Sequence, residues 1–228
     1  MSRYFKRITA PRSWKVQRKT NVFLLRPHPG AHSLERGLPL AIILRDYLGY
    51  AKNLKEAKMI LQTKNVLVDN ERRKSEHFLA GLLDVITIKE TKEHFRLILN
   101  KKGHLELLKI ADKEAGIKPK KILNKTVIKK GVLQLNLSDG TNQITKEQGY
   151  KTGDTILVEF PQKIVAHYKL ANEAAVYITG GKHQGERATV EGISEHGIMC
   201  KTEHANYVAQ KKHVFVIGDK QPCITLGK

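Results

Sequence analysis

The chain has 228 residues, which allows two or more small domains but not one large enzyme core. Lysine and arginine number 41 against 22 acidic residues, and the resulting formal charge of +19 favours a polyanionic partner, because neutralised phosphates release counterions. No apolar run reaches the roughly 18 residues of a membrane span, no secretory signal opens the chain, and the two cysteines form no C-x-x-C pair. We therefore expect a cytoplasmic protein with no membrane partner.

Residues 1–36 are predicted to form a basic N-terminal arm. Nine lysines and arginines, Arg3 among them, accompany a single acid, Glu35, and several prolines forbid a long helix. The aromatic residues of this segment, which could stack on unpaired bases or wedge into grooves, are Tyr4, Phe5, Trp14 and Phe23. We expect an extended arm that becomes ordered on RNA.

Two helices are predicted at the start of a domain that spans residues 37–103. "PLAIILRDYLGY" spaces its apolar residues at positions 40, 43, 44, 47 and 48, which is one helical face, and Gly49 should end that helix. Asn53 and Glu56 give an N-x-x-E start to the second helix.

The second helix should have one apolar side and one basic side. Leu54, Ala57, Ile60 and Leu61 are expected to face inward, whereas Lys55, Lys58 and Gln62 face solvent. The strands "NVLVD" and "LDVITI" follow, separated by the basic turn "NERRK". Helices packed on a small sheet, with lysines outward, would make a surface for backbone phosphates.

Residues 104–170 are predicted to form a central β-rich domain. "GHLELLKIAD" suggests a short helix at its start. Asp139 and Gly140 lie between strand-like runs, as in a tight hairpin, and Ile156, Val158 and Phe160 alternate along a later strand. No chemistry is apparent in this region.

Residues 171–217 contain short, closely spaced strands typical of an SH3-like barrel, and residues 218–228 form a tail. The stretch "YITGGKHQGERATVEGI" cannot be a phosphate-binding loop, because Glu186 and Arg187 follow Gly185 where Lys and Ser/Thr are required. It resembles a KOW motif instead, in which two glycines enclose a short basic loop between strands. Gly185 would then adopt a backbone angle closed to other residues.

Longer motifs carry a wider resemblance. The segment from "LRDYLGYAKN" to "LAGLLDVITI" resembles the alpha-L RNA-binding domain. Together with "RSW", "RPHPGAHSLERGLPL", "ILRDYL" and "GGKHQG", the order of parts resembles small-subunit ribosomal proteins of the S-four-e (S4e) family over essentially the whole chain. The early end after the KOW module is similar to the shorter archaeal form. The expected fold is therefore α+β and multidomain: the arm, an alpha-L domain, a β-rich domain and a KOW barrel.

The resemblance implies a structural protein of the small ribosomal subunit, bound to its ribosomal RNA (rRNA) beside neighbouring ribosomal proteins. The candidate RNA-binding residues are Arg12, Trp14, Lys15, Arg18, Lys19, Arg26 and Arg36 in the arm, Lys52, Lys55, Lys58, Arg72 and Arg73 in the alpha-L domain, and Lys182, His183 and Arg187 in the KOW loop.

Two other classes of protein are compatible with parts of the pattern. A pseudouridine synthase with the same module would need a catalytic aspartate, but Asp112, Asp139 and Asp154 are explained by helices or turns. A dissociable RNA-binding factor remains the alternative. His196, Cys200 and His204 come nearest to a metal-ligand spacing without matching one. We expect no catalytic residue, metal, cofactor or small-molecule substrate.

Overall fold

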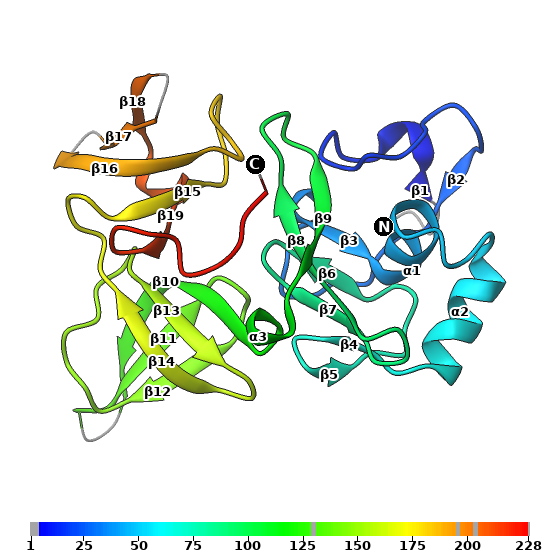
Figure 1. Cartoon of the computed structure of the whole chain (residues 1–228), viewed down its shortest axis with the longest axis horizontal. Helices are drawn as coiled ribbons and strands as arrows, with labels where there is room; N and C mark the ends of the chain where they lie inside the picture. The colour runs from blue at the N-terminus through cyan, green and yellow to red at the C-terminus, as the bar shows by residue number, and fades with distance from the viewer. Residues whose placement is uncertain (1–4, 129–130, 195–196, 203–204, 228) are drawn as a thin grey trace. The chain divides into compact units, whose positions relative to one another are not determined.

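Most of the chain folds into short strands, and helices are few (Figure 1). The computed structural model describes residues 5–128, 131–194, 197–202 and 205–227. Two compact units can be distinguished: unit 1 combines Met1–Leu99 with Gly103–Gly116, and unit 2 combines Asn100–Lys102 with Ile117–Lys228. The expected multidomain fold is present, with much more β-structure than α-structure.

The N-terminal segment, predicted to be an extended arm, is folded as part of unit 1. An antiparallel ribbon joins β1 (Phe5–Lys6) to β2 (Phe23–Leu24), and two short turns of helix are η1 (Arg7–Thr9) and η2 (Leu34–Arg36). Trp14 is only 1% exposed and belongs to the core. The prediction of an extended arm was wrong, because apolar side chains of this basic segment, such as Trp14 and Leu24, are buried in the core. Composition alone does not reveal this burial. Arg3 and Tyr4 lie outside the described residues.

The first predicted helix exists, but its backbone hydrogen-bond pattern changes from α-helical to π-helical along its length. After β3 (Gly37–Pro39), α1 (Leu40–Ile42) continues directly as the π-helical turn η3 (Ile43–Tyr47). Residues 40–44 are all buried, and the chain leaves the helix at Gly49, whose φ of 70° suits a residue without a Cβ.

The second helix, α2 (Leu54–Thr63), begins where its cap was predicted. The side chain of Asn53 accepts a hydrogen bond from the backbone N–H of Glu56 at 2.9 Å. Ala57 and Leu61 are buried, whereas Leu54 is 40% exposed, so the apolar face is shorter than predicted.

The remaining strands of unit 1 make a two-stranded and a five-stranded sheet. β3 pairs with β6 (Leu79–Gly81). The larger sheet has the order β5-β4-β7-β8-β9, and its strands are β4 (Val66–Val68), β5 (Glu71–Arg72), β7 (Val85–Ile88), β8 (Glu93–Leu99) and β9 (Leu105–Ile110). The two strands predicted from "NVLVD" and "LDVITI" are confirmed as β4 and β7.

The short helix predicted from "GHLELLKIAD" is wrong, because these residues form β9. This strand pairs with β8 from His94 opposite Ile110 to Leu99 opposite Leu105. Long-range pairing overrides a leucine spacing that also fits a helix. The expected boundary between residues 103 and 104 thus falls inside a hairpin. The helix α3 (Asp112–Ala115) comes after the strand, at the end of unit 1.

Unit 2 contains two five-stranded antiparallel sheets. The order of the first is β12-β11-β10-β13-β14, with β10 (Ile117–Val127), β11 (Leu133–Leu137), β12 (Asn142–Thr145), β13 (Thr155–Glu159) and β14 (Lys163–Tyr168). The order of the second is β18-β17-β16-β15-β19, with β15 (Ala175–Ile178), β16 (Arg187–Ser194), β17 (Gly197–Lys201), β18 (Asn206–Ala209) and β19 (Val214–Gly218). The short helix η5 (Lys211–His213) precedes β19.

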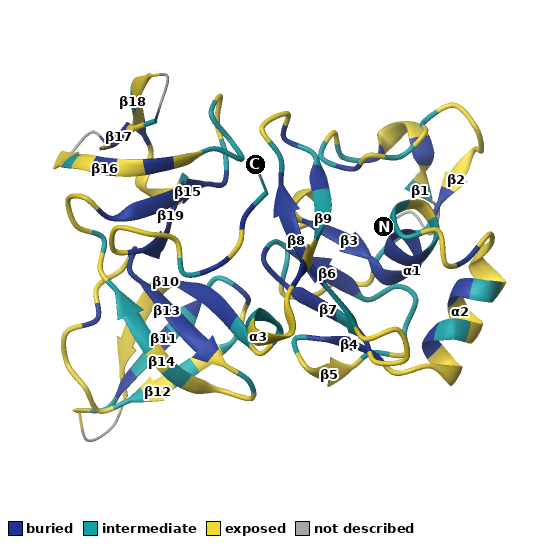
Figure 2. Ribbon diagram, viewed as in Figure 1, coloured by how far each residue is buried: buried dark blue, intermediate teal, exposed yellow. Residues whose placement is uncertain are grey.

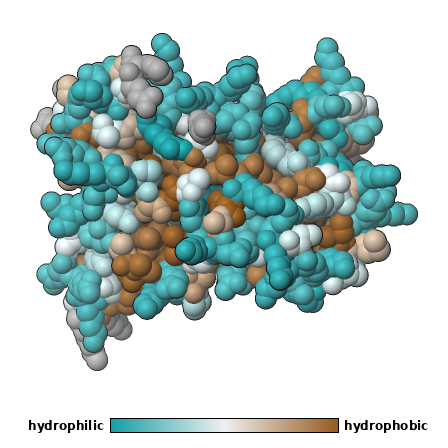
Figure 3. Space-filling model, viewed as in Figure 1, coloured by the Kyte–Doolittle hydropathy of each residue, from teal (hydrophilic) through white to brown (hydrophobic). Residues whose placement is uncertain are grey.

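Each sheet of unit 2 has an apolar core of its own. Ile122, Leu135 and Ile156 belong to the first core, and Val176 and Val190 belong to the second. Figure 2 shows buried residues along many of the strands, whereas most loops and some strands, such as β5, β12 and β18, are largely exposed. Hydrophilic side chains cover much of the face in Figure 3.

The hairpin turn predicted in unit 2 is confirmed, whereas the predicted alternation along the later strand is wrong, because Thr155 and Leu157 are buried together with Ile156 and Val158. The Asp139-Gly140 pair connects β11 to β12, and Gly140 has a φ of 76°. Ile156 and Val158 are buried in β13, whereas Phe160 beyond the strand is half-buried.

Candidate nucleic-acid interface

Two lysines of α2 and a third just before its cap residue, Asn53, form an exposed basic surface in unit 1. Lys52, Lys55 and Lys58 are all exposed. The helix start beneath them is doubly capped, because the Glu56 carboxylate also accepts from the Lys52 backbone N–H at 2.7 Å. Lys58 Nζ lies 3.7 Å from a carboxylate oxygen of Glu76 and is 53% exposed. The three lysine side chains are therefore exposed to solvent, next to a helix start that capping hydrogen bonds hold in place.

Arg72 and Arg73 are connected to this surface in different ways. Arg72 is exposed and donates to the backbone carbonyl of Gln62 at 3.0 Å, at the C-terminal end of α2. Arg73 lies with its guanidinium carbon 4.7 Å from the ring centroid of Phe78 and also pairs with Glu71. Of the two arginines, Arg72 is the one that extends the α2 surface with its charge toward solvent.

The predicted arm residues fall into exposed and internally bonded groups. The exposed members are Arg12, Lys15, Lys19 and Arg36, whereas Arg26 is half-buried. Lys15 Nζ lies 3.4 Å from Glu106 Oε1. Arg18 donates to the carbonyls of Ile8, Ala10 and Pro11 at 3.2, 2.7 and 2.9 Å. Arg18 therefore organises its own loop, in contrast to the predicted role as a free RNA contact.

Trp14 is not accessible to a base. Its indole Nε1 donates to the carbonyl of Leu34 at 3.1 Å, and its ring meets the ring of Phe5 edge-on at 5.8 Å. Because its side chain is buried, the prediction that it stacks on RNA is wrong.

In the loop between β15 and β16, Lys182 is exposed and His183 is half-buried. His183 stacks on Tyr207 with ring centroids 3.9 Å apart, and its Nδ1 lies 3.2 Å from Glu186. Arg187, the first residue of β16, donates to the carbonyls of Leu226 and Gly227 and is still exposed, so its contact with RNA stays a prediction. The expected backbone angle at Gly185 is confirmed by its φ of 82°.

Three lysines of β10 are buried, and sequence reasoning missed them. Lys118, Lys120 and Lys121 are 2%, 5% and 6% exposed. Lys120 Nζ lies 2.7 Å from Asp139 Oδ2, and Lys118 Nζ lies 3.7 Å from the same oxygen. Lys121 Nζ donates to the carbonyls of Lys211 at 2.7 Å, Lys212 at 3.3 Å and Val214 at 2.6 Å.

Asp139 is the counter-charge of this cluster. Burial alone would raise the pKa of its carboxyl group, but the charge of Lys118 and the hydrogen bonds from Lys120 and Thr141 lower that pKa overall. Pairing of this kind is what allows charged side chains to be buried. No simple sequence signal distinguishes these lysines from surface lysines.

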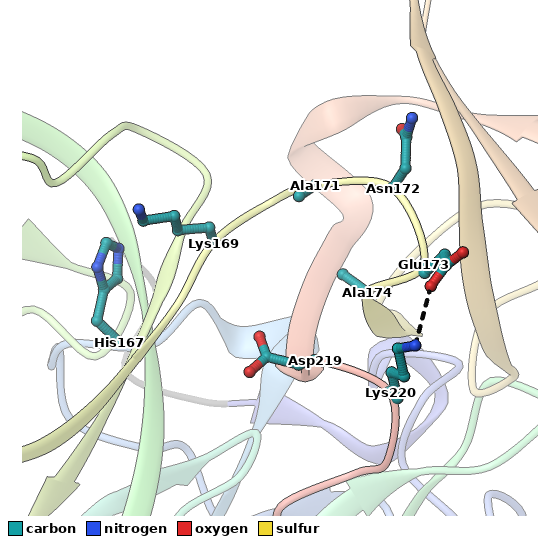
Figure 4. A pocket seen from close by; sticks show the side chains of 8 residues that line it. All are labelled: His167, Lys169, Ala171, Asn172, Glu173, Ala174, Asp219 and Lys220. Atoms are coloured by element: carbon teal, nitrogen blue, oxygen red, sulfur yellow. Dashed lines mark ion pairs between the residues drawn. The ribbon is translucent and has the colours of Figure 1, made fainter.

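A hollow of about 360 Å³ lies between the ends of β14 and β19 in unit 2 (Figure 4). Lys220 and Glu173 form an ion pair across it at 3.3 Å, and Lys169, Asp219 and His167 also line it. His167 is bonded to Asp154 at 2.9 Å. The mixed charges favour neither an anion nor a cation.

Groups of possible metal ligands and membrane-spanning helices were both looked for in the part of the chain that the structure describes. Within those ranges, no three His, Cys, Asp or Glu residues gather where they could hold a metal ion. His196 and His204, which contribute to the nearest metal-like spacing in the sequence, lie outside the described ranges. Among the described residues, no helix has the length and apolar character needed to cross a bilayer.

Comparison with known proteins gives consistent matches. The family model described as ribosomal family S4e matches residues 91–165, and the RS4NT domain model matches residues 1–35. The proteins named small ribosomal subunit protein eS4 from Methanococcus aeolicus and Methanocaldococcus jannaschii are each 41% identical, over 98% of this chain and 97% of theirs. The crystal structure of the 30S ribosomal protein S4e from Thermoplasma acidophilum matches with a TM-score of 0.70 and 31% identity. That match covers 81% of this chain and 96% of the other.

Proposed function

The chain belongs to the S4e family of ribosomal proteins, and from this premise we propose that it is a structural constituent of the small ribosomal subunit in the cytoplasm. Its partners are small-subunit rRNA and neighbouring ribosomal proteins. The family is one of structural rather than catalytic proteins, in keeping with the expectation that the chain is not an enzyme.

The modules proposed for this role are an alpha-L domain and a KOW barrel. Two consecutive helices next to the β5-β4-β7-β8-β9 sheet support the first. A strand, a glycine-bounded turn with Gly181 and Gly185 at positive φ, and the returning strand β16 support the second.

The observation that carries the proposal is the lysine surface of α2. Lys55 and Lys58 are exposed on one capped helix, Lys52 is exposed just before its cap, and Arg72 is bonded to the other end of the helix. Exposed cations gathered along one helix suit the phosphates of folded RNA, which is recognised largely by shape and backbone contact. The residues proposed to contact RNA are Arg12, Lys15, Lys19, Arg36, Lys52, Lys55, Lys58, Arg72, Lys182 and Arg187, with Arg26, Arg73 and His183 as partly covered neighbours.

Sedimentation of native lysate through a sucrose gradient in high salt tests this function. A structural constituent should remain in the small-subunit peak at one copy per particle. Recovery at the top of the gradient would favour the alternative, a dissociable RNA-binding factor.

A further inference from the structure

His183 connects the tip of the loop between β15 and β16 to the β17–β18 hairpin. Its imidazole ring stacks on the ring of Tyr207 in β18, with centroids 3.9 Å apart and planes that are nearly parallel, at 8°. Nδ1 of His183 also lies 3.2 Å from Oε2 of Glu186, three residues later in the same loop. One side chain therefore contacts both a neighbouring strand and the C-terminal end of its own loop.

Tyr207 gives this contact a fixed support. It is directly opposite Cys200 in the β17–β18 pairing, and Cys200 is completely buried in the second core of unit 2. Opposite residues of an antiparallel pair share a face, and the Tyr207 ring accordingly packs against that core. Burial raises the pKa of its hydroxyl group, and among the described residues no hydrogen-bond partner reaches the hydroxyl oxygen. The ring, rather than the hydroxyl group, is therefore what holds His183.

The backbone bonds of the loop are better at its base than at its tip. At the base, the N–H of Gly185 donates to the carbonyl of Ile178 at 2.7 Å. Across the tip, the bond from the N–H of Gln184 to the carbonyl of Gly181 is long, at 3.4 Å. Gly181 and Gly185 both have positive φ, which glycine adopts at little cost. The side chain of His183 thus supplies the contact that fixes the tip.

Lys182 is the cation that this contact places. It directly precedes His183 at the tip and is exposed, whereas His183 is half-buried. A cation on an unfixed loop loses conformational entropy when it binds, and a contact that fixes the loop beforehand reduces that loss. Holding His183 in place therefore also holds the backbone from which Lys182 extends.

We propose that the stack of His183 on Tyr207 positions Lys182 to bind a backbone phosphate of rRNA. His183 and Tyr207 are then positioning residues, which act on RNA binding through Lys182. This inference rests on the proposed function, since it concerns one contact of the rRNA interface. It adds Tyr207, which the sequence analysis did not single out, to the residues on which RNA binding depends.

Equilibrium binding of the full chain to a transcript of its small-subunit rRNA, at several salt concentrations and with excess unrelated RNA, tests the proposal. Lys182→Ala should lower the salt slope by about one unit and weaken binding about fivefold near 0.15 M salt, as expected for one phosphate contact. Tyr207→Leu removes no charge, yet it should also lower the slope, because Lys182 is no longer held in place. Loss of a base-stacking contact would instead leave the slope unchanged.

Variants that keep or remove the ring provide matched controls. Tyr207→Phe and His183→Phe each preserve two stacked rings and should bind within about twofold of the parent. His183→Ala removes a ring without touching the core and should behave like Tyr207→Leu. Val208→Ala changes a neighbouring side chain of β18 that is 61% exposed, and it should leave both affinity and slope unchanged.

A double variant separates positioning from an independent effect on binding. In a Lys182→Ala background, Tyr207→Leu should weaken binding by less than about twofold, because the cation that it positions is already absent. Urea unfolding followed by far-UV circular dichroism establishes that each variant is folded under the conditions of the binding experiment.

Several outcomes would overturn the proposal. An unchanged salt slope in both Tyr207→Leu and His183→Ala would show that the stack does not position Lys182. Equal losses in His183→Phe and His183→Ala would make the imidazole nitrogens, and not the ring, the important group. Parent-like binding by Lys182→Ala would remove the tip of the loop from the interface. Failure of the parent chain to prefer its rRNA would instead refute the proposed function itself.

Discussion

Two lysine-rich segments of this chain place their charges in opposite environments. At α2, Lys52, Lys55 and Lys58 are exposed, whereas on β10 Lys118 and Lys120 are almost completely buried. The cause is the position of each element. β10 is the middle strand of a five-stranded sheet, whereas α2 is covered along one side only. A high local lysine content therefore does not by itself identify an RNA-binding surface.

The strongest way to test this contrast is to remove the buried counter-charge. Asp139→Ala should lower the free energy of unfolding by about 3 to 5 kcal/mol, because two buried ammonium groups lose their partner. Urea unfolding followed by far-UV circular dichroism measures the change. Trp14 fluorescence, which reports unit 1, is recorded in the same titration.

Glu159→Ala on β13 is the matched control for that experiment, since Glu159 is an exposed carboxylate in the same sheet. Its unfolding free energy should change by no more than about 0.5 kcal/mol. Equal effects of the two substitutions would show that burial of Asp139 is unimportant.

Lys121 offers a smaller perturbation of the same strand. Lys121→Met keeps the apolar stem but leaves three backbone carbonyls without their ammonium donor. We expect a loss of about 1 to 3 kcal/mol in the free energy of unfolding, measured in urea. Lys163→Met, at an exposed position on β14, should leave stability unchanged. Both variants should bind rRNA alike, and weaker binding by Lys121→Met in its folded state would contradict the burial of this lysine.

Substitution of the exposed lysines should affect RNA binding more than stability. Changing both Lys55 and Lys58 to Ala should weaken rRNA binding and reduce the salt slope by about two units, about one for each phosphate contact. The unfolding free energy should change by less than about 1 kcal/mol, because surface ion pairs such as Lys58–Glu76 contribute little. An unchanged slope in filter-binding titrations would remove α2 from the interface.

The pH dependence of stability is expected to show the smallest effect. The pKa of Asp139 is lowered in the folded protein, so its stabilising contribution is present above the unfolded value of about 3.9 and is lost as the pH falls through the lower folded value. The difference in unfolding free energy between the parent and Asp139→Asn should therefore be constant near neutrality and shrink below about pH 4. A difference that persists into stronger acid would mean that the charge is not what stabilises this site.

Sequence reasoning succeeded where local rules determine the structure. The cap at Asn53, the end of the first helix at Gly49 and the Asp139-Gly140 turn each depend on a few adjacent residues. The exposure of the α2 lysines follows from the helical period, which is equally local.

It failed where distant residues determine the environment of a side chain. Trp14 is covered by Phe5 and by the carbonyl of Leu34, which lie 9 and 20 residues away in the sequence. The leucines of β9 fit a helix or a strand until pairing with β8 is known. The family resemblance identified the function without resolving which basic residues remain accessible.

The bonds of Lys121 also set an order of events during synthesis. Its acceptors lie 90 to 93 residues further along the chain. At translation rates of about 5 to 20 residues per second, the residues that carry those carbonyls are synthesised about 5 to 20 s after Lys121. During that interval the ammonium group of Lys121 is exposed, although it is buried in the folded protein. A newly made chain can therefore bind RNA more strongly than the folded protein.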